Sequence, residues 1–158
     1  MRVSGVVDGA IAGAVGSAAL NVVSYLDVAV RARPTSSTPE ETVGRLAGLA
    51  HVDLGPEDRA ANRRSGLGAV LGYALGIGAG AVFGVLAGTR RMPLPVATAL
   101  LGGAVMATTG GSLAVLRISD PRTWRRSDWV ADLVPHLAYG MAAAATLNRL
   151  RPPSLRCG

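Results

Sequence analysis

Lysine is absent from this chain of 158 residues, and aromatic residues and cysteine are scarce. Phe, Trp and Tyr make up only 4% of the sequence, which is less than a water-soluble core of this size normally uses. Apolar residues nevertheless reach 49%, and 21 glycines come in addition. This composition is typical of helices that pack in a membrane by close approach of their backbones. The single cysteine, Cys157, excludes an intramolecular disulfide.

The positive charge is carried by arginine alone, with 16 arginines and a formal net charge of +6. Nucleic-acid binding requires basic residues gathered on one face, often beside stacking aromatics. Here the arginines stand between apolar segments, as at Arg63 with Arg64 and Arg90 with Arg91, which is the pattern that flanks membrane helices. We therefore expect the lipid bilayer as a partner and no nucleic acid. The preference for arginine over lysine is typical of a GC-rich genome and indicates a bacterial cytoplasmic (inner) membrane.

A glycine-rich segment at residues 66–88, GLGAVLGYALGIGAGAVFGVLAG, contains no charged residue. Its substring GIGAG is reminiscent of a dinucleotide-binding loop, which needs a preceding strand and an acidic residue about twenty positions later. No Asp or Glu occurs in the twenty positions after Gly80. The length suits a hydrocarbon core of about 30 Å, so the segment is predicted to be a transmembrane helix. Six of its glycines follow a strict four-residue interval: Gly68, Gly72, Gly76, Gly80, Gly84 and Gly88.

Three further apolar segments accompany this one, so the chain is predicted to cross a membrane four times. The expected spans are residues 5–30, 66–88, 94–116 and 129–147. The first span has a cleaved signal peptide as its alternative, but Asp8 and the lack of a clear cleavage site argue against it. The predicted fold class is all-α: an integral membrane four-helix bundle that forms a single membrane domain over residues 1–158.

The connections differ in length and carry their own signals. In the loop of residues 31–65, Thr38 reads as an N-cap, Pro39 as the first helical residue and Glu41 as the end of a capping box, which predicts a short amphipathic surface helix. Residues 55–58 start a second helix that continues into span 66–88. Residues 119–121 predict a similar surface helix in the third loop. The short link at 89–93 predicts that spans two and three are antiparallel neighbours.

The orientation of the chain in the membrane receives two opposite indications. Four spans place both termini and the short link on one side, with 6 arginines, and the two long loops on the other, with 10. Because positive charge marks the cytoplasmic side, the arginine count favours cytoplasmic long loops. Net charge indicates the opposite, since all seven acidic residues of the loops accompany those 10 arginines.

Small residues at four-residue intervals are also present in the other spans. The first span offers Gly9 and Gly13, and the third offers Ala99, Gly103, Ala107 and Gly111. Such rows allow two helix backbones to approach closely and cross with a right-handed angle. We expect these rows and the six glycines of residues 66–88 to pack the four helices. The alternative is that one row joins copies of the chain in a homo-oligomer or a larger membrane complex.

Ionisable and polar residues inside the spans form the candidate functional site. Charge within a membrane is costly and normally faces the bundle interior or a cavity. Asp132 and His136 lie one turn apart on the same face of the fourth span, and Asp27 lies at comparable depth in the first. The predicted intramembrane cluster is Asn21, Tyr25, Asp27, Asp132, His136 and Tyr139. The Asp–His pair either fixes the register of the helices or handles protons, because histidine titrates near neutral pH.

Known catalytic and cofactor-binding motifs do not occur. The chain has no nucleophile elbow, no zincin helix and no phosphate-binding loop. Two histidines and one cysteine are too few for a convincing metal site. We therefore expect no catalytic residue, metal or cofactor, and enzymatic activity is the less favoured interpretation.

The sequence PHLAYG, within residues 129–145, resembles an HLxYG-type pattern of small, uncharacterised four-span bacterial inner-membrane proteins that are loosely YagU-like. The shared positions are His136, Tyr139 and Gly140. That family is linked to acid resistance, so the resemblance implies a proton-related role. The small-residue rows and this resemblance lead to two predicted functions. The first is a non-enzymatic structural or accessory membrane protein that packs through Gly-xxx-Gly rows. The second is a small transporter or proton-linked stress-resistance protein that uses the Asp/His cluster.

Overall fold

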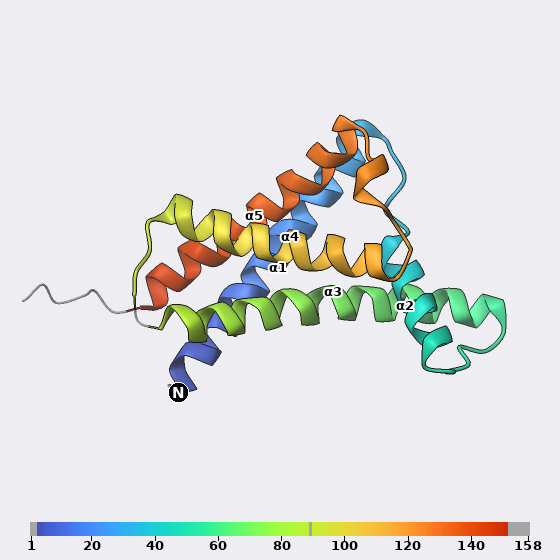
Figure 1. Ribbon diagram of the computed structural model, residues 1–158, viewed down its shortest axis with the longest axis horizontal. Coiled ribbons are helices and arrows are strands. Elements are labelled where there is room, and N and C mark those ends of the chain that lie inside the picture. Colours follow the sequence, from blue (N-terminus) through green and yellow to red (C-terminus); the bar gives the residue numbers. More distant parts are fainter. Residues whose placement is uncertain (1–2, 89, 152–158) are drawn as a thin grey trace, which may run out of the picture.

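The protein is all-α in the computed structural model, which describes residues 3–88 and 90–151 and has no strand among them (Figure 1). Its elements are α1 (Val3–Arg31), α2 (Thr38–Leu49), α3 (Glu57–Ala87), α4 (Leu94–Val115), the 3-10 turn η1 (Pro121–Thr123) and α5 (Arg126–Leu150). Helices α1, α3, α4 and α5 are long and apolar enough to cross a membrane. The predicted fold class is therefore confirmed. Cys157 lies outside the described residues.

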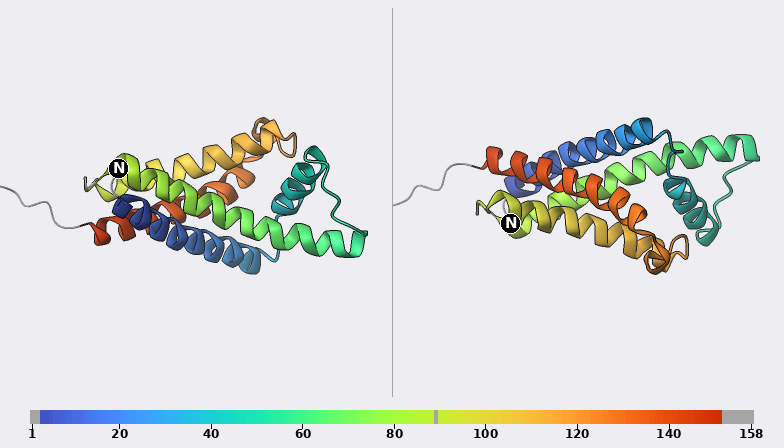
Figure 2. Two further views of the ribbon diagram at one scale, coloured as in Figure 1. Left: turned by 90° about the horizontal axis from the view of Figure 1, so that it is seen from below. Right: turned by 90° about the horizontal axis from the view of Figure 1, so that it is seen from above.

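The four long helices run alternately in opposite directions, as in an up-and-down bundle (Figures 1 and 2). Helix α1 packs against both α3 and α5, and α5 also packs against α4, whereas the contact between α3 and α4 is small. The short link between α3 and α4 makes them antiparallel, as predicted. They are also in contact, but each packs mainly against another helix.

One end of the bundle holds the hairpin between α3 and α4 together with the start of α1 and the end of α5 (Figure 1). Side chains fasten this end. The Nη2 of Arg91 donates to the carbonyl of Arg151 at 2.6 Å, and the Nη1 of Arg151 donates to the carbonyl of Arg90 at 2.5 Å. The Nδ2 of Asn148 donates to the carbonyl of Met92 at 3.2 Å. These three bonds satisfy backbone carbonyls that have no partner within a helix.

The loop helices agree with the sequence in part. Helix α3 begins at Glu57, so the helix predicted to continue into residues 66–88 is confirmed. Helix α2 also exists, but its N-cap is Ser37 rather than Thr38, and the hydroxyl of Ser37 donates to Glu41 Oε1 at 2.5 Å. The third loop contains only the single turn η1, whose N-cap Asp120 accepts from the Arg122 amide at 2.9 Å. Extended backbone at Trp124 ends this turn before a surface helix can form.

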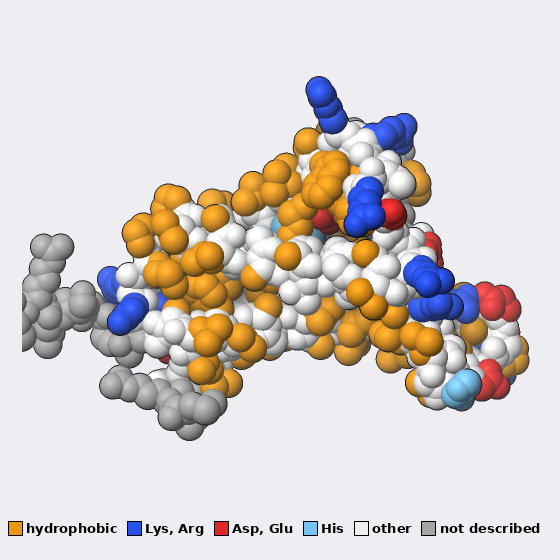
Figure 3. All heavy atoms as spheres, in the orientation of Figure 1, with side chains coloured by type: hydrophobic (Ala, Val, Ile, Leu, Met, Phe, Trp, Pro, Cys, Tyr) orange, Lys and Arg blue, Asp and Glu red, His pale blue; other side chains and the backbone are white. Residues whose placement is uncertain are grey.

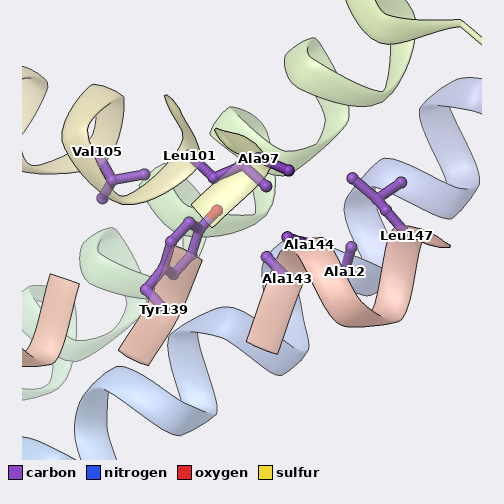
Figure 4. Packing of buried hydrophobic residues seen from close by; sticks show 8 residues of the cluster. All are labelled: Ala12, Ala97, Leu101, Val105, Tyr139, Ala143, Ala144 and Leu147. Atoms are coloured by element: carbon purple, nitrogen blue, oxygen red, sulfur yellow. The ribbon is translucent and has the colours of Figure 1, made fainter. Parts of the chain in front are cut away.

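The buried core is built from small side chains and a few large ones. Tyr139, Leu101 and Leu147 are the largest fully buried residues. Figure 4 shows them with the rest of the cluster, which comes from α1, α4 and α5: Ala12, Ala97, Leu101, Val105, Tyr139, Ala143, Ala144 and Leu147. Because alanine removes little apolar surface from water, this core depends on close packing more than on burial of large residues.

Large apolar side chains cover much of the outer surface. Val30, Leu86 and Val115 are each exposed by 80% or more. Figure 3 shows hydrophobic atoms spread over the middle of the bundle, while arginine and acidic side chains gather toward its ends. A water-soluble protein rarely exposes so large an apolar surface. The arrangement is that of a small multi-pass membrane protein with its apolar faces toward lipid.

Candidate functional site

His136 lies on α5 and is only 8% exposed. Its position one turn after Asp132 lets the imidazole fold back along the helix, where Nδ1 is 2.7 Å from the backbone carbonyl oxygen of Asp132. The same nitrogen is 3.4 Å from the carboxylate oxygen Oδ1 of Asp132. A carbonyl oxygen can only accept a hydrogen bond, so Nδ1 carries the proton in this arrangement. The structure thus brings together the two residues that the sequence placed on one face.

The other ring nitrogen of His136 faces α4. Its Nε2 is 3.4 Å from the hydroxyl oxygen of Thr109, and that hydroxyl also lies 3.0 Å from the carbonyl of Val105, to which it can donate. Because Nδ1 donates to the Asp132 carbonyl, Nε2 is the ring nitrogen that can accept a hydrogen bond. The sequence analysis missed Thr109 as a member of this site. Thr109 lies on another helix, so nothing in the sequence around His136 indicates it.

Asp27 does not join this pair. Its carboxylate accepts from the Nε of Arg33 at 2.6 Å and from the Nη1 of Arg31 at 3.4 Å, at the loop end of α1. Tyr25 is 64% exposed and therefore on the outer surface. Asn21 is half-buried on α1. The six predicted cluster residues consequently do not converge on one point: Asp132 and His136 lie together, and Asp27 is occupied by its own arginines.

Tyr139 is fully buried in the cluster that includes residues of α4, and its hydroxyl reaches α3. Its hydroxyl donates to the backbone carbonyl of Gly76 at 2.6 Å, which joins α5 to α3. The ring occupies space left by Gly16 of α1, where a Cβ would lie 2.7 Å from the ring carbon Cδ2. Two glycines on two other helices therefore make room for one tyrosine, and Tyr139 fixes the point where α1, α3 and α5 meet.

The glycines of α1 and α3 face each other along a continuous contact. A Cβ added at Gly9 would lie 2.9 Å from the Cα of Ala81, and one added at Gly13 would lie 2.5 Å from the carbonyl oxygen of Gly76. Added Cβ atoms at Gly80 and Gly84 would meet the backbone of α1 just as closely. These distances are shorter than real Cβ contacts, so the two backbones touch only because side chains are absent.

The remaining predicted packing glycines do not share this contact. Gly68 faces α2, where a Cβ would lie 2.9 Å from the side chain of Pro39. A Cβ at four other positions would meet nothing within 4 Å: Gly72, Gly88, Gly103 and Gly111. The α3 row drifts around its helix, as a four-residue spacing must with 3.6 residues per turn, so one partner helix cannot cover all of it. The expectation that every member packs two helices of the chain therefore needs correction at these four positions.

Helices α4 and α5 use a glycine pair that the predicted packing set did not include. A Cβ at Gly102 would lie 2.5 Å from the carbonyl oxygen of His136, and one at Gly140 would lie 2.8 Å from the amide nitrogen of Gly102. The sequence reasoning placed Gly103 in this role, but Gly103 points away from α5. Adjacent glycines differ by 100° around a helix, and the sequence offers no signal for which of the two faces the partner.

The site offers hydrogen bonding and one titratable imidazole, and little else in the way of chemistry. Among residues 3–88 and 90–151, no group of three or more His, Cys, Asp or Glu side chains could hold a metal ion. The polar side chains bind mainly to backbone carbonyls of their own or a neighbouring helix. Comparison with protein families, curated proteins and solved structures finds no match for this chain.

Proposed function

We propose that the protein is a non-enzymatic structural or accessory membrane protein whose helices pack through small-residue rows. The observation that supports the proposal is that buried polar side chains join one helix to another. The hydroxyl of Tyr139 links α5 to the Gly76 carbonyl of α3, and His136 lies between its own helix and Thr109 of α4. Each of these side chains holds helices in register, a role that hydrogen bonds commonly fill inside membranes.

Self-association is part of this proposal. Helix α4 carries Ala99, Gly103, Ala107 and Gly111 on an exposed face. The same kind of row is covered by α1 where it occurs on α3. A second copy of the chain is the occupant that suits the uncovered row of α4, because small-residue rows favour contact with another helix over contact with lipid.

The bacterial cytoplasmic membrane is the proposed location, supported by the arginine-only basic charge and by the resemblance around His136, Tyr139 and Gly140. The arginine count favours cytoplasmic long loops, and net charge favours the opposite orientation. Trp124 and Trp129 lie in the same loop region and suit a membrane interface on either side of the bilayer. These two rings pack edge to face with centroids 5.1 Å apart.

A proton-linked role is the second candidate, and one observation favours it. The side chain of Asp132 remains 28% exposed beside an imidazole that is 10% exposed, so the pair is not sealed. With Nδ1 held by a carbonyl, Nε2 of His136 is the nitrogen that would exchange protons.

Proton flux into vesicles distinguishes the two functions. The purified protein is reconstituted with a pH-sensitive dye inside, a pH gradient is imposed, and a potassium ionophore compensates charge. The structural proposal expects the dye response of protein-free vesicles. A faster response that His136→Gln abolishes and that the exposed-loop variant His51→Gln preserves would establish the proton-linked function and overturn the structural one.

A further inference from the structure

Two adjacent cavities lie at the loop end of the bundle. The first, about 700 Å³, lies between α2, α3 and the residues that follow α4. The second, about 650 Å³, lies along the last turns of α4 and the third loop. Arg117 and Ile118 line both cavities. Neither cavity is lined by Asp132 or His136, so this region is separate from the site described above.

Arginines from three elements line the first cavity: Arg45 of α2, Arg64 of α3 and Arg117 after α4. Arg64 pairs with Glu57, and its Cδ packs over Gly44, where a Cβ would lie 3.3 Å away. Arg45 and Arg117 take part in no ion pair within the described part of the chain. Two guanidinium groups are therefore available for an oxyanion such as phosphate.

The same cavity also contains negative charge. Glu40 lines it, and the carboxylate oxygen Oε2 of Glu40 is buried without a hydrogen-bond partner among the described residues. A buried carboxylate oxygen without a donor is costly, so its environment suits a ligand that brings an N–H group. Glu41 is already engaged by the hydroxyl of Ser37. The ligand that fits both signs carries an anionic group and an ammonium group together.

The position of the cavity selects a lipid over a water-soluble molecule. Arg117 comes two residues after Val115, which is 83% exposed on the apolar surface of α4. Val70, on the α3 side, is 64% exposed. Trp124 follows in the same loop, and tryptophan prefers the depth where lipid headgroups lie. A molecule in this cavity can therefore extend apolar chains along the outer faces of α3 and α4.

The backbone at Arg117 adds a second observation. Its φ is 57°, in the left-handed region that favours glycine, and its amide donates to the carbonyl of Ala114 at 3.1 Å to end the helix. Glycine at this place would satisfy the same helix ending without strain. The side chain of Arg117 lines both cavities, and we attribute the presence of arginine instead of glycine at this position to its role there.

We propose that the charged cavity binds the headgroup of a phospholipid that carries a primary amine, with Arg45 and Arg117 on the phosphate and Glu40 on the ammonium. The second cavity, floored by Gly110, Gly111 and Ala114, leaves room beside the headgroup for the start of an acyl chain. Gly111 belongs both to the second cavity and to the α4 row proposed for self-association, whereas the headgroup contacts do not involve that row. The site does not depend on proton transfer at His136.

Lipid binding to the full chain in detergent, measured by native mass spectrometry, tests the proposal. Phosphatidylethanolamine, phosphatidylcholine and phosphatidylglycerol with identical acyl chains are compared. The primary amine is expected to bind about tenfold more tightly than the other two, since only it offers both an N–H donor and a phosphate. Equal binding of all three, or preference for phosphatidylglycerol, would overturn the pairing of Glu40 with ammonium.

Variants assign the contacts. Arg117→Gly should weaken binding of all three lipids about tenfold and leave the melting temperature unchanged or higher, because glycine relieves the backbone. Glu40→Gln should abolish only the preference for the primary amine. Arg59→Gln, an exposed arginine of α3 outside the cavity, is the matched control. Unchanged binding in Arg117→Gly, or displacement of the lipid by chain-free phosphoethanolamine at equal concentration, would contradict the lipid site.

Discussion

Helices α3 and α4 both carry small residues at four-residue intervals, yet their rows meet different surroundings. On α3, Gly80 and Gly84 face the backbone of α1, and Gly76 faces the side chain of Ser17, also on α1. On α4, Gly103 and Gly111 have open space where a Cβ would stand. The spacing is the same, so it identifies a surface that can receive a helix. It does not say whether that helix belongs to the same chain.

The connection between α3 and α4 sharpens this lesson. A short hairpin joins the two helices, but α3 packs mainly on α1 and α4 mainly on α5. A hairpin fixes direction and holds only the joined ends close together. Contact along the length of the helices comes from complementary surfaces, here Gly9 and Gly13 facing Gly80 and Gly76.

The largest expected effect is a loss of stability when a side chain is added to the covered row, that is, to the α3 glycines that lie against α1. In Gly80→Leu the new Cβ would lie 2.7 Å from both Cα and N of Gly13. These are backbone atoms, so no side-chain rotation can relieve the overlap, and we expect a loss of about 3 kcal/mol in the free energy of unfolding. Thermal unfolding in detergent measures the change.

Gly72→Leu is the matched control, because Gly72 belongs to the same row and meets nothing within 4 Å. Its melting temperature should stay at the wild-type value. Equal destabilisation by both variants would mean that glycine itself matters at any position of α3. If neither variant lowered the melting temperature, the whole row would face lipid.

A smaller effect on folding is expected from the uncovered row. Gly103→Leu adds a side chain into open space, so the free energy of unfolding should change by less than about 0.5 kcal/mol. Self-association, measured by analytical ultracentrifugation in detergent, should weaken about tenfold if this row joins two copies. Gly78→Leu, an exposed off-row position on α3 with nothing nearby, should leave association unchanged. Unaltered association in Gly103→Leu would remove α4 as the contact between copies.

The membrane helices could be predicted from the sequence because a long charge-free apolar segment leaves few alternatives in lipid. Residues 66–88 and 94–116 correspond closely to the membrane-spanning parts of α3 and α4. Which helices pack together could not be predicted. Every span carries small residues on more than one face, as Gly102 and Gly103 show, and a rotation of 100° decides which of them meets α5.

The candidate site was predictable only as far as neighbours on one helix. Asp132 and His136 share a face because they are one turn apart, and that relation is local. The partner of Asp27 was not local to its turn, since Arg33 lies beyond the end of α1 and reaches back to the carboxylate. The bond from Tyr139 to Gly76 joins residues 63 positions apart and depends on how three helices meet.

Contacts between the Hα protons of glycines in α1 and the Hα protons of α3 test the central claim most directly. Nuclear Overhauser effects in the detergent-solubilised protein report such short proton–proton distances. The account predicts cross-helix signals between Gly9 and Ala81 and between Gly13 and Ile77, because a Cβ placed at either glycine would lie 2.9 Å from the partner Cα. Signals from these glycines only to detergent chains would contradict the claim that the covered row holds α1 against α3.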